Sequence, residues 1–124
     1  MMGPSGPRPI EGILGSDLWT EVDDYVSNLL VASDPALEQS LIDSRRAGLP
    51  PMHVSPNQGK RLQILTCAFR ARTILEAGTL GGYSTIWMGR ALPVDGHLNP
   101  LEASPLHVQV ARTNIRGERV WIGS

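Results

Sequence analysis

The stretch from Thr73 to Thr85 constrains the fold more than any other part of the sequence. It contains a short apolar run, an acid, three glycines and a segment that can open a helix. This order predicts a strand, a tight turn and a helix. Glycine is needed where the backbone turns with a positive φ or approaches a ligand closely, because a Cβ would clash there. The stretch therefore predicts a ligand site at the carboxyl end of a strand in an α/β sheet.

The glycine spacing indicates which ligand is favoured. A dinucleotide fingerprint places glycines as G-x-G-x-x-G, with the opening helix aimed at a pyrophosphate. Here the residues from Gly78 to Gly82 place Leu80 at the second glycine position, which hinders close approach of a pyrophosphate. Glu76 precedes the glycines and would repel phosphates, whereas it suits a ligand with a cation and ribose hydroxyls. S-adenosylmethionine is such a ligand.

Composition limits the classes of protein and partner. The chain has 124 residues with 41% apolar and 19% charged residues, which is typical of a globular domain. Eleven basic and twelve acidic residues give a formal charge of -1, which argues against nucleic acid and anionic membranes as partners. No apolar run approaches the roughly 20 residues of a membrane span. We expect a cytoplasmic protein, with its single cysteine, Cys67, buried and inert.

Caps and hydrophobic periodicity predict the other elements. Residues 1–15 are rich in Gly and Pro, and we expect them to form a disordered leader. Asp34, Ser55 and Ser104 each precede a proline and predict N-caps. The inward face of the last helix is predicted as Leu106, Val110 and Ala111. The expected helices lie at about 16–32, 35–48, 56–69, 83–93 and 105–115, and the expected strands at about 73–76, 97–102 and 119–122.

Strands that alternate with helices predict an α/β fold with a parallel, doubly wound sheet. Three strands are few for such a sheet, which is normally covered on both faces. We therefore expect residues 16–124 to be the N-terminal, cofactor-binding part of a larger, apparently truncated domain. Trp87 and Met88 lie at helical positions beside the sheet and are interpreted as core residues, with a cofactor-pocket wall as the alternative.

Three motifs together resemble one enzyme family. They are residues 51–60 (Pro-Met-His-Val-Ser-Pro-Asn-Gln-Gly-Lys), residues 74–85 of the glycine stretch, and Leu101-Glu102. In sequence and spacing they resemble the cation-dependent O-methyltransferases, which include the caffeoyl-CoA and catechol enzymes. The resemblance implies a partial Rossmann-like class I methyltransferase fold. It also implies methyl transfer from S-adenosylmethionine to a hydroxyl of a catechol-like or other small acceptor, with a divalent cation such as Mg²⁺.

The resemblance also implies roles for six cofactor-binding residues. Glu76 would hold the methionine end of the cofactor, through its ammonium group directly or by way of water, and Glu102 would take both ribose hydroxyls. Val54, in the strap before the third helix, would touch the cofactor, and Gly78 and Thr79 would line it with backbone. Ser84, at the start of the next helix, would hydrogen-bond the methionine portion.

No catalytic or metal-binding residue is assigned. The metal ligands implied by the family, an Asp-x-Asp cluster and a later Asp-Asn pair, have no counterpart in this sequence. His53, His97 and His107 are too scattered for a metal signature. Because the metal would lower the pKa of the acceptor hydroxyl and orient it, we expect this chain alone to have little or no methyltransferase activity.

Two alternative functions and a possible homodimer are also compatible with the sequence. The chain can instead be a non-catalytic cofactor-binding or helix-mediated interaction protein of the same family. A dinucleotide oxidoreductase is the third possibility, disfavoured by Leu80. Leu18, Trp19 and Val22 are a candidate subunit contact, because bacterial methyltransferases of the type resembled commonly form homodimers.

Overall fold

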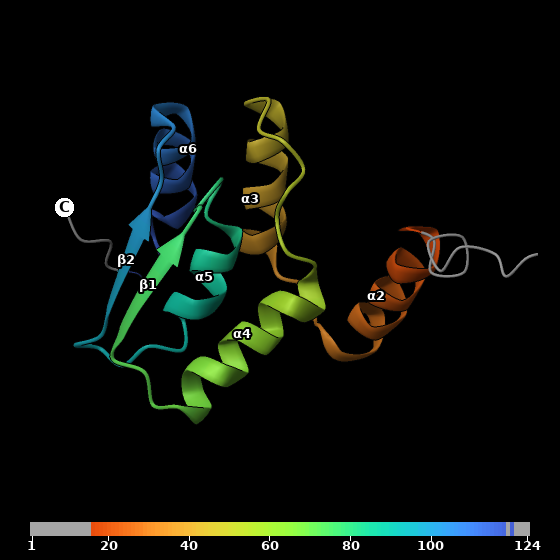
Figure 1. Cartoon of the computed structure of the whole chain (residues 1–124), viewed down its shortest axis with the longest axis horizontal. Coiled ribbons are helices and arrows are strands. Elements are labelled where there is room, and N and C mark those ends of the chain that lie inside the picture. Colours follow the sequence, from red (N-terminus) through yellow and green to blue (C-terminus); the bar gives the residue numbers. More distant parts are fainter. Residues whose placement is uncertain (1–15, 119, 121–124) are drawn as a thin grey trace, which may run out of the picture.

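The computed structural model describes residues 16–118 and residue 120. Within them the chain forms five helices and two strands in the order α2, α3, α4, β1, α5, β2, α6 (Figure 1). The predicted leader at 1–15 lies outside the described residues. So does the predicted strand at 119–122, except for Val120, which belongs to no helix or strand.

The two described strands form a parallel pair. β1 spans Thr73–Ala77 and β2 spans His97–Leu101, with Glu76 in register with Pro100. Proline removes a ladder donor and is expected at a sheet edge. Among the described strands β2 pairs only with β1, so Pro100 is accommodated there. The pairing brings the carboxyl ends of both strands to the same edge, where the predicted ligand residues lie.

The predicted caps set the beginnings of three helices. α3 (Pro35–Arg46) begins after Asp34, whose carboxylate accepts hydrogen bonds from the backbone N–H groups of Ala36 and Leu37. α4 (Pro56–Ala68) begins after Ser55, whose backbone N–H donates to the Gln58 side chain at 3.2 Å. α6 (Pro105–Ile115) begins after Ser104. These bonds satisfy N–H groups that the first turn of a helix leaves free.

The core forms where α5 (Tyr83–Gly89) packs against α3, α4 and α6. Figure 1 shows α5 beside the strands, with α4 crossing below it. Trp87 and Met88 are both buried, which confirms the core interpretation. Gly59 of α4 provides room for Trp87, because a Cβ at Gly59 would lie 2.3 Å from the indole ring. The principal buried cluster is Leu37, Tyr83, Ile86, Trp87, Ala111 and Ile115.

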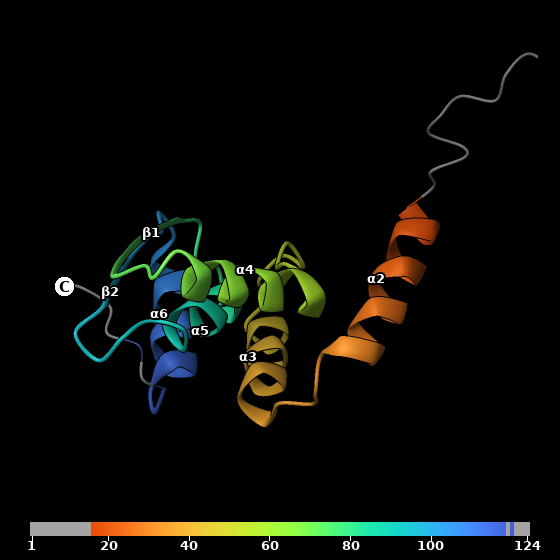
Figure 2. The ribbon, with the colours of Figure 1, turned by 90° about the horizontal axis from the view of Figure 1, so that it is seen from below.

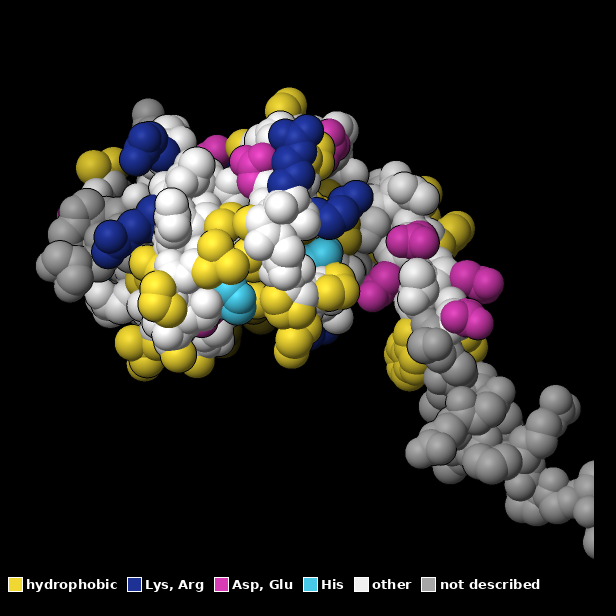
Figure 3. Space-filling view, turned by 90° about the horizontal axis from the view of Figure 1, so that it is seen from above, with side chains coloured by type: hydrophobic (Ala, Val, Ile, Leu, Met, Phe, Trp, Pro, Cys, Tyr) yellow, Lys and Arg dark blue, Asp and Glu magenta, His cyan; other side chains and the backbone are white. Residues whose placement is uncertain are grey.

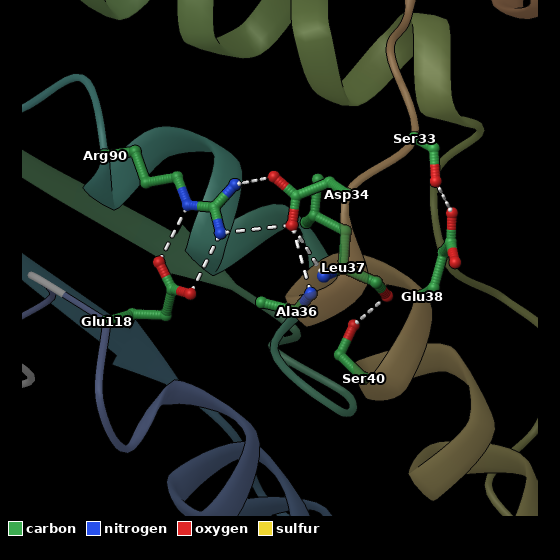
Figure 4. Close-up of polar contacts among 8 residues, drawn as sticks. All are labelled: Ser33, Asp34, Ala36, Leu37, Glu38, Ser40, Arg90 and Glu118. Carbon is green, nitrogen blue, oxygen red and sulfur yellow. Dashed lines mark hydrogen bonds and ion pairs between the residues drawn. The ribbon is translucent and has the colours of Figure 1, made fainter.

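Arg90 connects three segments that are far apart in the sequence. Its guanidinium donates to Asp34 at 2.5 Å and to Glu118 at 2.7 and 2.9 Å (Figure 4). Asp34 caps α3, Arg90 follows α5 and Glu118 follows α6. Both carboxylates raise the pKa of Arg90, so it stays charged. This cluster ties together the ends of the helices that hold the core.

α2 (Ser16–Leu30) projects away from the remaining elements, as Figure 2 shows. Its contact with α4 includes Asn57, which bonds the side chains of Asp23 and Ser27. In Figure 3 acidic side chains gather over α2, whereas Lys and Arg side chains lie over the rest of that face together with a few acidic ones. The apolar side chains of α2 are largely exposed, namely Leu18, Trp19, Val22, Tyr25, Leu29 and Leu30.

Several expectations about helix ends and faces were wrong. The helix predicted to reach Pro93 ends at Gly89, because Ala91 and Leu92 bond to carbonyls three residues back and so form a turn. Leu106 is exposed, since α6 packs through Ala111 and Ile115. Cys67 is also exposed, because the buried residues of α4 are Gly59 and Thr66. No helix among the described residues is long and apolar enough to cross a membrane.

Candidate functional site

Glu76 lies near the carboxyl end of β1 and is turned toward the start of α5. It is 8% exposed, and its two carboxylate oxygens accept hydrogen bonds from two hydroxyls. Thr85 Oγ1 donates to Oε2 at 2.5 Å, and Ser84 Oγ donates to Oε1. Burial raises the pKa of Glu76, while the two hydrogen bonds lower it in part. The site therefore contains a buried acid held by neutral donors.

Glu102 follows β2 and binds the same loop from the other side. Its Oε2 accepts a hydrogen bond from the backbone N–H of Leu80 at 3.1 Å, and its Oε1 accepts one from Ser104 N–H at 3.0 Å. His107 Nδ1 lies 3.4 Å from Oε1, where it makes an ion pair if protonated but no hydrogen bond. The bond from Ser104 is the main reason that the pKa of Glu102 is lowered. Glu102 is thus the more readily ionised of the two acids.

Glycine and an unusual leucine shape the loop between the acids. Gly78 has φ +81°, and a Cβ there would meet nothing within 4 Å, so its backbone faces open space. Leu80 also has a positive φ of 48°, a conformation that costs a non-glycine residue energy. Asn114 of α6 fixes the next residue by donating to Gly81 O at 2.8 Å. The loop is therefore held in place while one side of it stays open.

A hollow opens beside this loop. Val54, Gly78, Thr79 and Ser84 border it, as do the strap residues Leu49, Pro50, Met52 and His53. Glu76 and Glu102 do not border it, but each bonds a residue that does, Ser84 and Leu80 respectively. Four of the six predicted cofactor residues thus border the hollow, and the other two lie directly behind it.

The hollow is small. Its volume of about 80 Å³ is well below the roughly 300 Å³ at which ligand pockets begin. The hollow is therefore too small to enclose a drug-sized ligand by itself. A larger cavity of about 270 Å³ lies between α2, α3, α4 and α5, bordered by Leu37, Tyr83 and Trp87 among others. None of the six predicted cofactor-binding residues borders it, and its Asp34 is already engaged by Arg90, so we assign the candidate site to the smaller hollow.

Comparison with known proteins identifies the family. The model of the O-methyltransferase family matches residues 28–120, which include both acids and the loop. The chain belongs to the O-methyltransferase family. The family resemblance seen in the sequence is thereby confirmed.

Relatives and solved structures agree with this assignment. The catechol O-methyltransferase of Niastella koreensis is 49% identical over 102 residues, which are 82% of this chain and 46% of that protein. The catechol O-methyltransferase of Mycobacterium tuberculosis is 46% identical over 96 residues, 77% of this chain and 44% of that protein. The O-methyltransferase from Bacillus cereus, solved in complex with S-adenosylhomocysteine (SAH), has a TM-score of 0.80 at 48% identity. That match covers 86% of this chain and 50% of the other.

The chain spans about half the length of the O-methyltransferases that it matches. The α/β methyltransferase-like fold predicted from the sequence is confirmed by these structures. The part present here contains the β1 loop and the end of β2.

Among the described residues of this O-methyltransferase chain, Thr79 Oγ1, Trp87 Nε1 and His107 Nδ1 are buried without a hydrogen-bond partner, and of these residues only Thr79 borders the hollow. Thr79 is 3% exposed, and its Oγ1 has no hydrogen-bond partner among the described residues. Such an atom costs free energy unless a ligand or water satisfies it. Thr79 borders the hollow, and the Gly78 backbone beside it is open. Both features fit a polar ligand against this loop.

A metal ion does not fit the described residues in the same way. Across residues 16–118 and 120, no group of three or more His, Cys, Asp or Glu side chains could hold one. His53 borders the hollow, but its ring packs edge-on against Tyr83, with centroids 5.8 Å apart. His107 lies beside Glu102, and His97 begins β2.

The structure also reveals supporting residues that sequence reasoning missed. Thr85 binds Glu76, and Asn114 binds the loop carbonyl of Gly81. Thr85 directly follows the predicted Ser84, so a second hydroxyl in the first turn of the helix was an available signal. Asn114 is 33 residues from Gly81, and no local pattern in the sequence indicates that contact.

Proposed function

We propose that this chain forms the S-adenosylmethionine-binding part of a cation-dependent O-methyltransferase. The observation that carries the proposal is the convergence of Glu76 and Glu102, from the ends of two adjacent parallel strands, on one glycine loop. Ligands of open α/β sheets bind outside the carboxyl ends of the strands. The open Gly78 backbone and the unpartnered Thr79 hydroxyl lie at that place.

Each residue has a distinct part in the proposed site. Glu76 and Ser84 receive the ammonium of the methionine portion, and Glu102 accepts hydrogen bonds from the ribose hydroxyls. Gly78 and Thr79 line the cofactor, and Val54 contacts it from the strap. The bound cofactor supplies an activated methyl group. The contribution of these residues is orientation, because in-line transfer requires donor and acceptor to be held in alignment.

The acceptor is proposed to be a small hydroxyl compound of the catechol type. Two relatives at 46 and 49% identity are catechol O-methyltransferases, and the acceptor assignment rests on that likeness. We further propose that the 124-residue chain alone transfers little or no methyl, because it lacks counterparts of the family's metal ligands. We place it in the cytoplasm.

Calorimetry tests the cofactor role directly. The 124-residue chain is titrated with SAH, and NAD is titrated in parallel as the competing cofactor class. Saturable SAH binding without NAD binding is expected. Absence of SAH binding at millimolar ligand contradicts the proposal, and binding of NAD alone supports the oxidoreductase. In a separate assay with catechol, Mg²⁺ and S-adenosylmethionine, robust turnover contradicts the proposed inactivity of the chain alone.

The exposed face of α2 favours a second candidate, a helix-mediated interaction protein whose partner is a second copy of the chain. Trp19 is 59% exposed, and Leu18 and Val22 lie on the same helix. Sedimentation velocity tests it: the wild-type chain should dimerise and Trp19→Glu should shift it to monomer. A wild-type chain that stays monomeric at high concentration contradicts this candidate and leaves the cofactor role unaffected.

A further inference from the structure

Thr85 is a buried polar residue that the proposed cofactor contacts do not include. Its exposure is 0%, and it does not border the hollow. Its hydroxyl donates to Glu76 Oε2 at 2.5 Å. A buried hydroxyl needs a partner, and a buried carboxylate needs donors even more. The bond between Thr85 and Glu76 satisfies both requirements.

The hydroxyls of two consecutive residues each bind one oxygen of the Glu76 carboxylate. Ser84 Oγ donates to Oε1 and borders the hollow, whereas Thr85 occupies Oε2 within the protein. Fixing Oε2 also fixes the rotation of the carboxylate plane, so Oε1 must face Ser84. The Ser84 oxygen, whose proton is directed at the carboxylate, then presents its lone pairs to a donor in the hollow.

Within residues 16–118 and 120, Ser84 and Thr85 are the only hydrogen-bond donors to the Glu76 carboxylate. Its pKa is shifted by burial and by the hydrogen bonds from Ser84 and Thr85. Glu102, at the end of β2, is bonded to Leu80 and Ser104. At the far end of α5, Arg90 is bonded to Asp34 and Glu118. Loss of the Thr85 hydroxyl therefore leaves one buried carboxylate oxygen without its donor.

We propose that Thr85 is a positioning residue that orients Glu76 toward Ser84 and so prepares the hollow for the ammonium group of the cofactor. This inference rests on the proposed function. Thr85 acts through Glu76 and touches no ligand atom. Its effect should therefore be confined to ligands that carry the ammonium group.

Two ligands and two variants test this role. SAH carries the amino-acid ammonium, and 5′-methylthioadenosine shares the adenosine and thioether but lacks the amino acid. Thr85→Val keeps the shape of the side chain and removes the hydroxyl, and Thr85→Ser retains the hydroxyl. Thr85→Val should weaken SAH binding by about tenfold, the lower end of the effect of losing a hydrogen bond to a charged group. It should leave 5′-methylthioadenosine binding unchanged, and Thr85→Ser should restore SAH binding.

The outcomes separate this inference from the proposed function. If the wild-type chain binds SAH and Thr85→Val binds it equally well, the positioning role is wrong and the cofactor site stands. Equal weakening of both ligands, without rescue by Thr85→Ser, shows a purely structural role and also overturns the inference. A wild-type chain that binds neither ligand overturns the proposed function itself. If circular dichroism shows that Thr85→Val loses helix, Thr85→Ala repeats the comparison without the added methyl group.

Discussion

The carboxylate of Glu102 accepts a hydrogen bond from the backbone N–H of Leu80 at 3.1 Å. Leu80 has φ 48°, a left-handed conformation that costs a residue with a Cβ roughly 1 kcal/mol or more. The bond joins the end of β2 to the loop after β1, so the acid proposed for the ribose also holds the loop that lines the cofactor. Ligand binding and loop geometry should therefore depend on the same side chain.

Replacement of Glu102 by Gln should weaken SAH binding by about tenfold or more. The amide has one acceptor oxygen, whereas the carboxylate serves Leu80 and Ser104 with two. Calorimetry measures the change. Glu118→Gln is the matched control, because Glu118 binds Arg90 and does not border the hollow. Equal SAH affinity in wild type and Glu102→Gln would contradict the proposed role of Glu102.

Replacement of Gly78 by Ala should reduce SAH affinity with only a modest loss of stability. The added Cβ would meet no protein atom and would occupy the open side of the loop. The positive φ of 81° should cost about 1 kcal/mol in the free energy of unfolding. Urea unfolding and SAH titration measure the two effects.

Gly117→Ala is the control for Gly78→Ala. Gly117 also has a positive φ, 97°, with open space around it, but it follows α6 and does not border the hollow. It should lose similar stability and keep its SAH affinity. If both variants keep full affinity, the cofactor does not approach Gly78.

Replacement of Arg90 by Ala should destabilise the fold by about 2 kcal/mol or more, because two carboxylates lose their shared partner and each hydrogen bond to a charged group contributes roughly 1.5–3 kcal/mol. The midpoint of urea unfolding measures the loss. Arg72→Ala is the matched control, because Arg72 pairs with Asp95 where both side chains are about two-thirds exposed. Exposed pairs contribute at most about 1 kcal/mol. Equal losses in the two variants would show that the Arg90 cluster does not tie the helices together.

Replacement of Glu76 by Gln should separate stability from binding. Burial raises the pKa of Glu76 above its ordinary 4.5, so its protonated form favours folding. This contribution to stability is present below pH 4.5 and is lost as the pH rises through the raised pKa. The stability of Glu76→Gln relative to the wild type should therefore increase as the pH rises from about 4 to about 8. The variant should also bind SAH more weakly. Urea unfolding at the two pH values measures the first effect. A variant that becomes relatively less stable at the higher pH would contradict it.

Local chemistry explains what could be predicted from the sequence. Asp34, Ser55 and Ser104 act within the first turn of the helices that they begin, so a short segment was enough to predict those starts. The loop after β1 was equally accessible, because only glycine fits the open, left-handed position of Gly78 without strain. Four of the six predicted cofactor residues border one hollow as a result.

Burial was harder to predict because it depends on contacts between distant segments. Leu106 and Cys67 occur in apolar surroundings in the sequence, yet both are exposed because α6 and α4 turn other residues inward. In the sequence, Leu80 was interpreted only as the residue that occupies the second glycine position of a dinucleotide fingerprint. Its bond to Glu102 spans 22 residues and depends on the pairing of β1 with β2.

We propose that two acids from adjacent strands and the glycine loop between them hold an S-adenosylmethionine-type ligand. A ¹H–¹⁵N correlation spectrum of the labelled chain, titrated with SAH, tests this arrangement residue by residue. The amide signals of Gly78, Thr79, Leu80 and Ser84 should shift together and saturate, while the signal of Gly117 stays unchanged. Saturable shifts confined to the cavity bordered by Leu37 and Trp87, with the loop signals unmoved, would contradict it.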